Sequence, residues 1–263
     1  MENFDNNKDT DRNKSIGKTL LILSTFTITS PTQKTSDIAK KLDMNISTVS
    51  RHLNTLLDHG FLDRDDESGY YYPGIQVVSM AGATLHNMPV YRYCLPELQK
   101  LSYQYDIHGH MSILHGNEIV HLISTSGMKF QRHFIPTGHK QPAYCTAMGR
   151  CFLANMDKAQ LDKILTNTQL IKKTSFTKII KDDLMDEIER IKRVGYCFLK
   201  DELNEGACSI GAPIYDQRKH VIAAISISTT SQKIHDQVMK NELINALLVV
   251  SNKISNNLGY FHD

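Results

Sequence analysis

The sequence predicts an α+β protein of two domains, in which a small, mainly helical domain precedes a larger domain of helices flanking an antiparallel sheet. The length of 263 residues exceeds that of one ordinary domain. Up to Pro73 the apolar residues recur at helical spacing and then give way to two short strand-like runs. From Pro89 onward, helix and strand periodicities alternate along the chain.

The composition excludes several protein classes. Hydrophobic residues make up 41% and charged residues 22%, which rules out collagen-like, coiled-coil and disordered classes for most of the chain. No apolar run reaches the ~18 residues of a membrane helix, and the N-terminus lacks the apolar stretch of a secretory signal. The five cysteines form no CxxC pair, so we expect a protein of the reducing cytoplasm. The net charge of +2 does not by itself indicate a nucleic-acid partner.

Four segments are expected along the chain. Residues 1–14 are polar, with almost nothing to bury, and are predicted to form a disordered tail. The first domain then covers residues 15–73, and a linker helix covers residues 74–88, where Pro89 ends it. The second domain covers residues 89–263.

Three helices and a hairpin are predicted in the first domain. A first helix has an apolar face made of Ile16, Leu20, Leu23 and Phe26. A second, short helix starts at Thr35, where hydroxyl and carboxylate groups suit its free N–H groups. A tight turn at residues 43–45 leads into a third helix over residues 47–59. Residues 61–72 then read as strand, turn and strand.

This order of elements is typical of a winged helix-turn-helix, whose second motif helix enters the major groove of DNA. The polar face of that helix carries short donors and acceptors with one arginine, which suits base edges and phosphates. The candidate DNA-binding residues are Thr35, Ser47, Thr48, Ser50, Arg51, His52 and Thr55. The segment from Lys14 to Leu62 contains six basic and three acidic residues, a net charge of only +3. We therefore expect few phosphate contacts and binding as a dimer. The alternative is a solvated face, or one that contacts a protein.

Three segments, in order, resemble the IclR (isocitrate lyase regulator) family of bacterial transcription regulators. The first is SDIAKKLDMNISTVSRHLNTLLDHGFLDRDDESGYYYPG, which is similar to the DNA-binding domain of the family. The second is the run from Gly138 to Arg150, close to the family pattern Gly-x-x-x-Pro-x-His-x-Thr-Ala-x-Gly-Lys, with Tyr144 in place of the histidine and Arg150 in place of the lysine. The third is GYCFLKDELNEGACSIGAPIYD, which resembles the C-terminal signature but has Leu199 where the family usually has Asp or Ser.

The second domain contains the elements of a ligand-binding domain. Helical spacing is predicted over residues 89–105, 143–155, 182–194 and 234–258, and strands over 107–115, 119–126, 130–135, 196–199, 208–214 and 221–228. The resemblance implies the GAF-like or profilin-like effector-binding domain of the family. Ser226 and Ser228 alternate with apolar residues and so share one face of a strand. The residues alone favour a solvent-facing strand, whereas the resemblance implies that this face lines a ligand pocket.

The effector contacts implied by the resemblance are carried over one position at a time. Ala147 and Met148 would present backbone N–H groups to a ligand carboxylate at a helix start, an arrangement that suits an anion. The full implied set is Phe130, Ala147, Met148, Leu199, Ala207, Ser209, Ser226 and Ser228. Because Leu199 removes one polar contact, we expect an effector that is less polar than small oxo-acids, or one that is seated differently.

Enzymatic and metal-binding alternatives have weaker support. His108 and His110 share a strand face, with His115, His133 and His139 elsewhere, but chance pairs are expected among 12 histidines, so no metal or other cofactor is predicted. Cys145 lies near a helix start, yet the sequence places no catalytic partner beside it, and the family is non-enzymatic. We therefore expect no enzyme. An enzyme with a helical appendage and a regulator that binds protein remain the competing classes.

The expected function is that of a ligand-responsive repressor. The partners would be double-stranded DNA with a pseudo-palindromic operator, a small carboxylate-bearing effector, and further copies of the chain in a homodimer or tetramer, as the resemblance implies. The linker stripe Ile75, Val78, Ala81, Gly82 and Leu85 suits close packing with a second copy or, equally, burial against the chain's own core.

Overall fold

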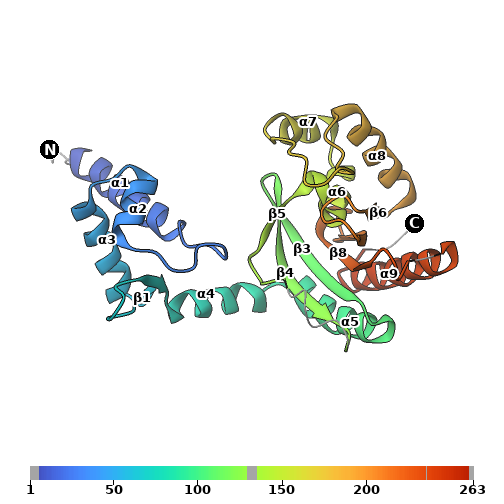
Figure 1. Ribbon diagram of the computed structural model, residues 1–263, viewed down its shortest axis with the longest axis horizontal. Coiled ribbons are helices and arrows are strands. Elements are labelled where there is room, and N and C mark those ends of the chain that lie inside the picture. Colours follow the sequence, from blue (N-terminus) through green and yellow to red (C-terminus); the bar gives the residue numbers. More distant parts are fainter. Residues whose placement is uncertain (1–5, 129–134, 235, 261–263) are drawn as a thin grey trace. The chain divides into compact units, whose positions relative to one another are not determined.

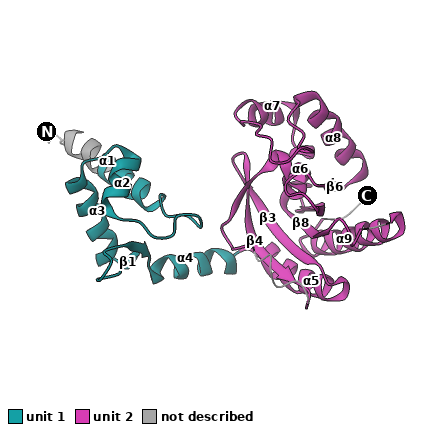
Figure 2. Cartoon of the chain, in the orientation of Figure 1, with its two compact units in different colours: residues 1–87 teal, residues 88–263 magenta. Residues whose placement is uncertain are grey.

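The computed structural model describes residues 6–128, 135–234 and 236–260 (Figure 1). The chain divides into two compact units, residues 1–87 and 88–263, called unit 1 and unit 2 (Figure 2). Within the described residues, no helix is both long and apolar enough to cross a membrane.

Unit 1 is a helix-turn-helix followed by a two-stranded antiparallel wing. Its elements are α1 (Asn6–Leu23), α2 (Thr35–Leu42), α3 (Ile46–Asp58), β1 (Leu62–Arg64), β2 (Tyr71–Pro73) and α4 (Ile75–His86). The core shared by α1, α2, α3, β1 and β2 is formed by Ile22, Ile38, Ala39, Val49, Leu53, Leu56, Leu62 and Tyr71. Asp43 lies in the left-handed region at φ 50° and ends α2, as expected for the tight turn.

The first helix differs from the sequence prediction in two ways. α1 begins at Asn6, so residues 6–14, expected to be disordered, continue a helix that neither Pro nor Gly interrupts in that stretch; residues 1–5 lie outside the described part. The predicted apolar face is also rotated, because Ile16 and Leu20 are exposed and Ile22 enters the core. Residues 20–23 are four consecutive apolar residues on about one helical turn, so the sequence does not fix which side is buried; the packing against α3 decides it.

Unit 2 contains a six-stranded antiparallel sheet of order β5-β4-β3-β8-β7-β6. The strands are β3 (His108–His115), β4 (Glu118–Ser126), β5 (Lys140–Pro142), β6 (Cys197–Lys200), β7 (Ala207–Tyr215) and β8 (Val221–Thr230). The helices are α5 (Pro89–Tyr105), the 3₁₀ turn η1 (Ala143–Cys145), α6 (Ala147–Ala154), α7 (Lys158–Thr166), α8 (Lys181–Val194) and α9 (Gln237–Asn257). Together with the winged unit 1, this arrangement confirms the predicted α+β fold class.

The sheet has a helical layer on each face. α5 and α9 contact each other and cover one face, and α6 with α8 covers the other (Figure 1). The strand predicted at residues 130–135 falls almost wholly outside the described residues, and the described edge strand beside β4 is β5. Helix α7 was not predicted, because two buried leucines give its short sequence little periodicity.

The linker helix α4 has no buried side chain within the described structure. Its large apolar residues Ile75, Val78 and Met80 are all exposed. The alternative that this stripe is buried against the chain's own core is therefore wrong for unit 1.

Glycine allows α6 to lie directly on the sheet. A Cβ on Gly211 would lie 2.7 Å from the backbone carbonyl atoms of Ala147 and 3.0 Å from the nitrogen of Met148. The first turn of α6 is thereby held against β7, and the side chain of Thr146 caps it by accepting from the N–H of Gly149 at 3.2 Å. This contact fixes one wall of the cavity described below.

Candidate functional site

The outer face of α3 carries most of the predicted DNA-binding residues. Ser47, Arg51 and Thr55 are exposed, and Thr48 and Ser50 are half-buried. Thr35, also half-buried, is the first residue of α2. The Thr55 hydroxyl donates to the carbonyl of Arg51 at 3.1 Å, so its oxygen remains available as an acceptor. These side chains can reach base edges or phosphates from one helix face.

His52 differs from the other predicted interface residues because it is buried. Its side chain is 5% exposed and its Nδ1 lies 2.8 Å from the Thr19 hydroxyl of α1. Burial lowers the pKa of His52, and the positive charges of Arg51 and Lys18 add to that effect. His52 lies one position from the outer face of α3. Because α1 packs at this position, the His52 side chain contacts α1.

A small basic groove lies where α1 meets α3. It has a volume of about 240 Å³ and is lined by Lys14, Ser15, Lys18, Thr48, Arg51 and His52. Three cations around a groove beside the recognition helix can hold a phosphate group. Lys14 and Lys18 were not among the predicted DNA-binding residues, although the excess of basic residues in this segment was the signal that could have indicated them.

Unit 2 contains a cavity of about 720 Å³ between the sheet and the start of α6. Seven of the eight residues implied by the resemblance line it, namely Ala147, Met148, Leu199, Ala207, Ser209, Ser226 and Ser228. Phe130, the eighth, lies outside the described residues. The volume falls within the range of ~300–1,000 Å³ usual for small-molecule sites.

Strand register forms the polar floor of the cavity. One row across the sheet consists of His108, Ser228, Ser209 and Leu199, which pair in that order from β3 to β6. The hydroxyls of Ser209 and Ser228 are 3.3 Å apart, and Ser226 is 2% exposed. The serine face of β8 therefore lines this cavity and is not the solvent-facing strand that the residues alone favoured.

The start of α6 forms a second wall. The N–H groups of a helix's first turn have no acceptor within the helix, and they carry partial positive charge. Ala147 and Met148 are the first two residues of α6, and both line the cavity. The Met148 sulfur also accepts from the Ser112 hydroxyl of β3 at 3.3 Å, which ties the helix start to the floor.

A buried ion pair holds residues 202–206, a loop that lines the cavity and is called its cover below. Arg150 is fully buried, and its Nη1 donates to Glu202 Oε1 at 2.9 Å while its Nη2 contacts Oε2. Its Nε donates to the Tyr144 carbonyl at 2.7 Å. The Thr177 hydroxyl donates to the Glu202 carbonyl at 2.6 Å, and the N–H of Lys178 donates to Glu202 Oε2 at 3.2 Å.

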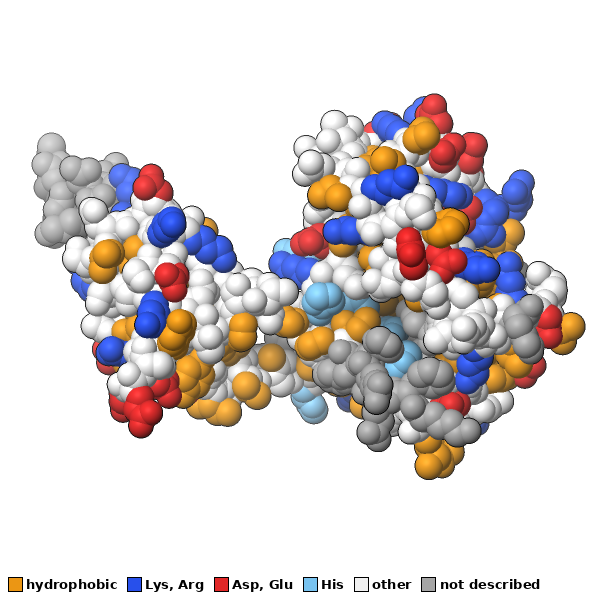
Figure 3. All heavy atoms as spheres, in the orientation of Figure 1, with side chains coloured by type: hydrophobic (Ala, Val, Ile, Leu, Met, Phe, Trp, Pro, Cys, Tyr) orange, Lys and Arg blue, Asp and Glu red, His pale blue; other side chains and the backbone are white. Residues whose placement is uncertain are grey.

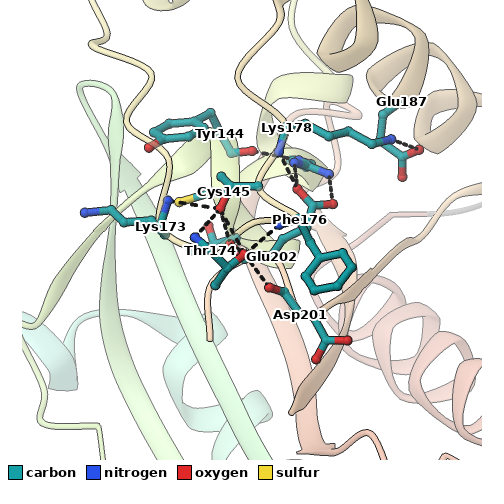
Figure 4. A network of polar contacts seen from close by, with 12 residues as sticks. Tyr144, Cys145, Lys173, Thr174, Phe176, Lys178, Glu187, Asp201 and Glu202 are labelled. Carbon is teal, nitrogen blue, oxygen red and sulfur yellow. Dashed lines mark hydrogen bonds and ion pairs between the residues drawn. The ribbon is translucent and has the colours of Figure 1, made fainter. Parts of the chain in front are cut away.

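The same network joins two irregular segments, one that contains Thr174 and Lys178 and one that contains Asp201 and Glu202. The Thr174 hydroxyl donates to the Asp201 carbonyl at 2.6 Å, and the residues of both segments surround the carboxylate of Glu202 (Figure 4). Residues 202–206 line the cavity. The Arg150–Glu202 pair therefore connects helix α6, which forms one wall, to the loop that forms the cover.

Three histidines line the cavity that sequence reasoning did not place there. His108 and His110 lie on β3 and His121 lies on β4. In the sequence, the alternation of His108 and His110 gives only a weak metal signal. In the described part of the chain, no group of three His, Cys, Asp or Glu side chains is arranged to hold a metal ion. His133 lies outside the described residues.

Cys145 also lines the cavity but lacks the features of a nucleophile. Burial raises the pKa of its thiol, which keeps it protonated, although the hydrogen bond with Tyr144 and the charge of Arg150 act in the opposite direction. The Sγ donates to the Pro142 carbonyl, at 3.8 Å. This environment is that of a structural cysteine.

Comparison with known proteins assigns both units. Residues 15–66 match the family model "IclR helix-turn-helix domain", and residues 82–256 match "Bacterial transcriptional regulator IclR C-terminal". The chain is 26% identical over 228 residues to the HTH-type transcriptional regulator XynR of Escherichia coli K12, covering 87% of this chain and 90% of that protein. It is 27% identical over 251 residues to the Pca regulon regulatory protein of Pseudomonas putida, covering 95% and 86%.

Solved structures give the same result. A putative transcriptional regulator from Rhodococcus sp. RHA1 superposes with a TM-score of 0.81 at 27% identity, covering 93% of this chain and 98% of that one. The Thermotoga maritima IclR superposes with a TM-score of 0.72 at 25% identity, covering 94% and 99%. Both the relatives and the matched family models describe transcription regulators, not enzymes. The chain belongs to the IclR family and is a DNA-binding transcription regulator with a C-terminal effector domain.

Proposed function

We propose that this regulator is a repressor whose operator binding is modulated by a small organic acid in the unit 2 cavity. The observation that carries this proposal is the cavity itself, in which a helix N-terminus and a serine floor line one volume. A carboxylate at the first N–H groups of α6 is favoured by both the free donors and the helix dipole. Hydroxyls of Ser209, Ser226 and Ser228 add donors on the floor.

The β6 side of the cavity supports an effector with an apolar part. Leu199 stands there, and its side chain cannot accept or donate a hydrogen bond. Aromatic or longer acids are therefore expected to bind more tightly than glyoxylate or pyruvate. A crystal structure of an IclR homologue from Microbacterium hydrocarbonoxydans, similar in fold at 20% identity and TM-score 0.81, is complexed with 4-hydroxybenzoate, which makes this acid a reasonable probe.

The DNA-binding part of the proposal rests on the outer face of α3 and the basic groove. Ser47, Thr48 and Arg51 are proposed to read base edges, and Lys14 and Lys18 to hold a phosphate. The HTH-type transcriptional repressor AllR of E. coli, 28% identical over 211 residues, is a named repressor in this family and supports the repressor role.

Self-association is proposed to run through the exposed apolar residues of α4. A helix without a buried side chain exposes Ile75, Val78 and Met80, and Figure 3 shows apolar side chains gathered over this part of unit 1. A homodimer, or a tetramer of two dimers, matches a two-fold symmetric operator, since half-site spacing follows protein symmetry. Because its partner is chromosomal DNA, we place the protein in the bacterial cytoplasm.

A two-part experiment tests the proposal. Thermal-shift screening of small carboxylic acids identifies binders, and gel-shift titration on the promoter beside its own gene measures their effect on operator affinity. We expect aromatic or longer monocarboxylates to raise the melting temperature and to change operator affinity. Glyoxylate or pyruvate binding as tightly as these acids would contradict the proposed apolar seat, and unchanged operator affinity with a bound acid would contradict the coupling.

A further inference from the structure

Three buried imidazoles occupy the side of the cavity formed by β3 and β4. His108 and His110 project from β3 and His121 from β4, and all three line the same volume as the start of α6. His110 is 3% exposed and His121 is 2% exposed. The proposed carboxylate contacts use none of these rings, so the second polar end of the cavity lacks an assigned role.

The hydrogen bond of His121, a residue that lines the cavity, defines which of its two nitrogens is left as an acceptor. Its Nε2 lies 2.8 Å from Gln141 Oε1, which can only accept, so Nε2 carries the proton. In a neutral imidazole the other nitrogen, Nδ1, then holds a lone pair. This Nδ1 is buried and has no hydrogen-bond partner among the described residues, and the same is true of Nδ1 of His110.

The two rings lie close enough to share one ligand group. The centroids of His110 and His121 are 5.8 Å apart with perpendicular planes, and those of His108 and His110 are 6.2 Å apart. His110 lies two residues before Ser112, whose hydroxyl contacts Met148 of α6. At the usual rise of a strand this is about 7 Å along β3, close to the span of a small ring with a group at each end.

The imidazoles of His110 and His121 are neutral at physiological pH. Burial lowers the pKa of His110 to about 3, and the neighbouring His121 and His108 add to the effect. Burial also lowers the pKa of His121, where the bond to Gln141 opposes the effect and His139 adds to it. On the α6 side, the thiol of Cys145 is protonated and Glu202 is paired with Arg150, while Glu205 lies in the cover. This wall therefore offers neutral acceptors, which suit a hydroxyl and penalise an anion.

We propose that the effector is a hydroxy acid whose carboxylate lies at the start of α6 and whose hydroxyl donates to Nδ1 of His121, beside His110. This inference rests on the proposed function for the carboxylate end and adds the class of the opposite end. A ligand without a donor leaves this buried acceptor unpartnered and therefore binds with less favourable free energy. The wall thus selects for a ligand with a hydroxyl.

Three benzene carboxylic acids that differ only at the para position test the proposal by isothermal titration of the full chain. The probes are 4-hydroxybenzoate, benzoate and terephthalate, which place a hydroxyl, a hydrogen and a second carboxylate at the same point. A parallel set, 4-hydroxybutyrate, butyrate and succinate, covers a cavity that prefers aliphatic chains. We expect the hydroxy acid to bind at least tenfold more tightly than either of its two analogues, in one set or both.

Two substitutions at one position separate the acceptor from the rest of the ring. In His121→Gln the amide replaces Nε2 and keeps a contact to Gln141 but removes Nδ1, so the preference for the hydroxyl is expected to fall to about onefold. In His121→Asn the amide oxygen replaces Nδ1, and the preference is expected to return. His115→Gln, at the exposed end of the neighbouring strand β3, is the matched control.

The outcomes are distinguishable. If no acid of either set binds, the proposed function fails and this inference fails with it. If the acids bind but the hydroxyl gives no advantage, or if His121→Gln keeps that advantage, the carboxylate site stands and the hydroxy-acid inference is overturned. Tighter binding of terephthalate or succinate, strengthening about tenfold per pH unit as the pH falls from 8 to 6, would show proton uptake by the imidazoles and overturn it as well.

Discussion

Replacing Glu202 with alanine removes one half of the ion pair that holds the cover of the cavity. The change leaves the Arg150 guanidinium fully buried without its bidentate partner and takes an acceptor from the N–H of Lys178. Breaking a buried pair in this way costs about 3–5 kcal/mol in the free energy of unfolding. For a unit of 150–250 residues each kcal/mol lowers the melting temperature by about 2–4 °C, so we expect a fall of about 6–20 °C.

Calorimetric and urea-induced unfolding measure this loss of stability. Two further variants show whether it arises from the buried ion pair. The double variant Arg150→Met, Glu202→Leu removes both charges and fills their volume with apolar groups, so most of the lost stability is expected to return. Lys181→Ala breaks the exposed pair with Asp162, whose atoms are 3.1 Å apart, and is expected to cost no more than about 1 kcal/mol.

The reasoning would be refuted by a cost below about 1 kcal/mol for Glu202→Ala, since that value belongs to a solvated pair. It would also be refuted if the double variant were as unstable as the sum of its two single changes, because the pair would then make no coupled contribution. A second readout is acid binding: the loosened cover is expected to weaken it in Glu202→Ala but not in Lys181→Ala.

Other predictions concern the interface, the floor and the charge state of the cavity. Arg51→Ala is expected to abolish specific operator binding in gel shifts while leaving the melting temperature unchanged; retained affinity would exclude Arg51 from recognition. Ser226→Ala with Ser228→Ala is expected to weaken acid binding and leave operator binding intact, and an unchanged ligand titration would contradict the role of the serine floor. Gly211→Ala introduces a Cβ 2.7 Å from the backbone of Ala147, so a loss of about 1–3 kcal/mol in stability with weaker acid binding is expected from urea unfolding and titration. Because the pKa of His110 is lowered to about 3, the unfolded chain binds a proton below pH 6.5 that the native chain excludes; its free energy of unfolding is expected to fall by about 1.4 kcal/mol per pH unit between pH 6 and 4, a slope that His110→Leu removes.

Local patterns predicted the elements whose environment is simple. The helix expected over residues 47–59 is α3 (Ile46–Asp58), and the strand expected at 221–228 is β8 (Val221–Thr230). In these cases a single periodicity runs through the whole element and one side is buried, so the sequence carries enough information. The same holds for the left-handed turn at Asp43, where local backbone conformation depends on the residue itself.

The site residues also divide into those that a local pattern predicted and those whose position depends on the packing of distant segments. Alternation placed Ser226 and Ser228 on one face of β8, and the family resemblance implied that this face lines a pocket. His52 was assigned to the outer face of α3, but Thr19, 33 residues earlier, decides its orientation. Lys14 and Lys18 counted toward the charge of the segment, yet their place beside Arg51 depends on how α1 crosses α3.

The sequence by itself determined the winged helix-turn-helix, the α+β class and the regulator family, because these follow from local periodicity and from motifs that each lie within about forty residues. Only the tertiary structure decided that His110 of β3 and His121 of β4 face the same cavity as the first turn of α6. The order and register of strands, together with one glycine that lets a helix lie on the sheet, bring these groups together. Such contacts depend on packing between distant segments, which no local pattern encodes.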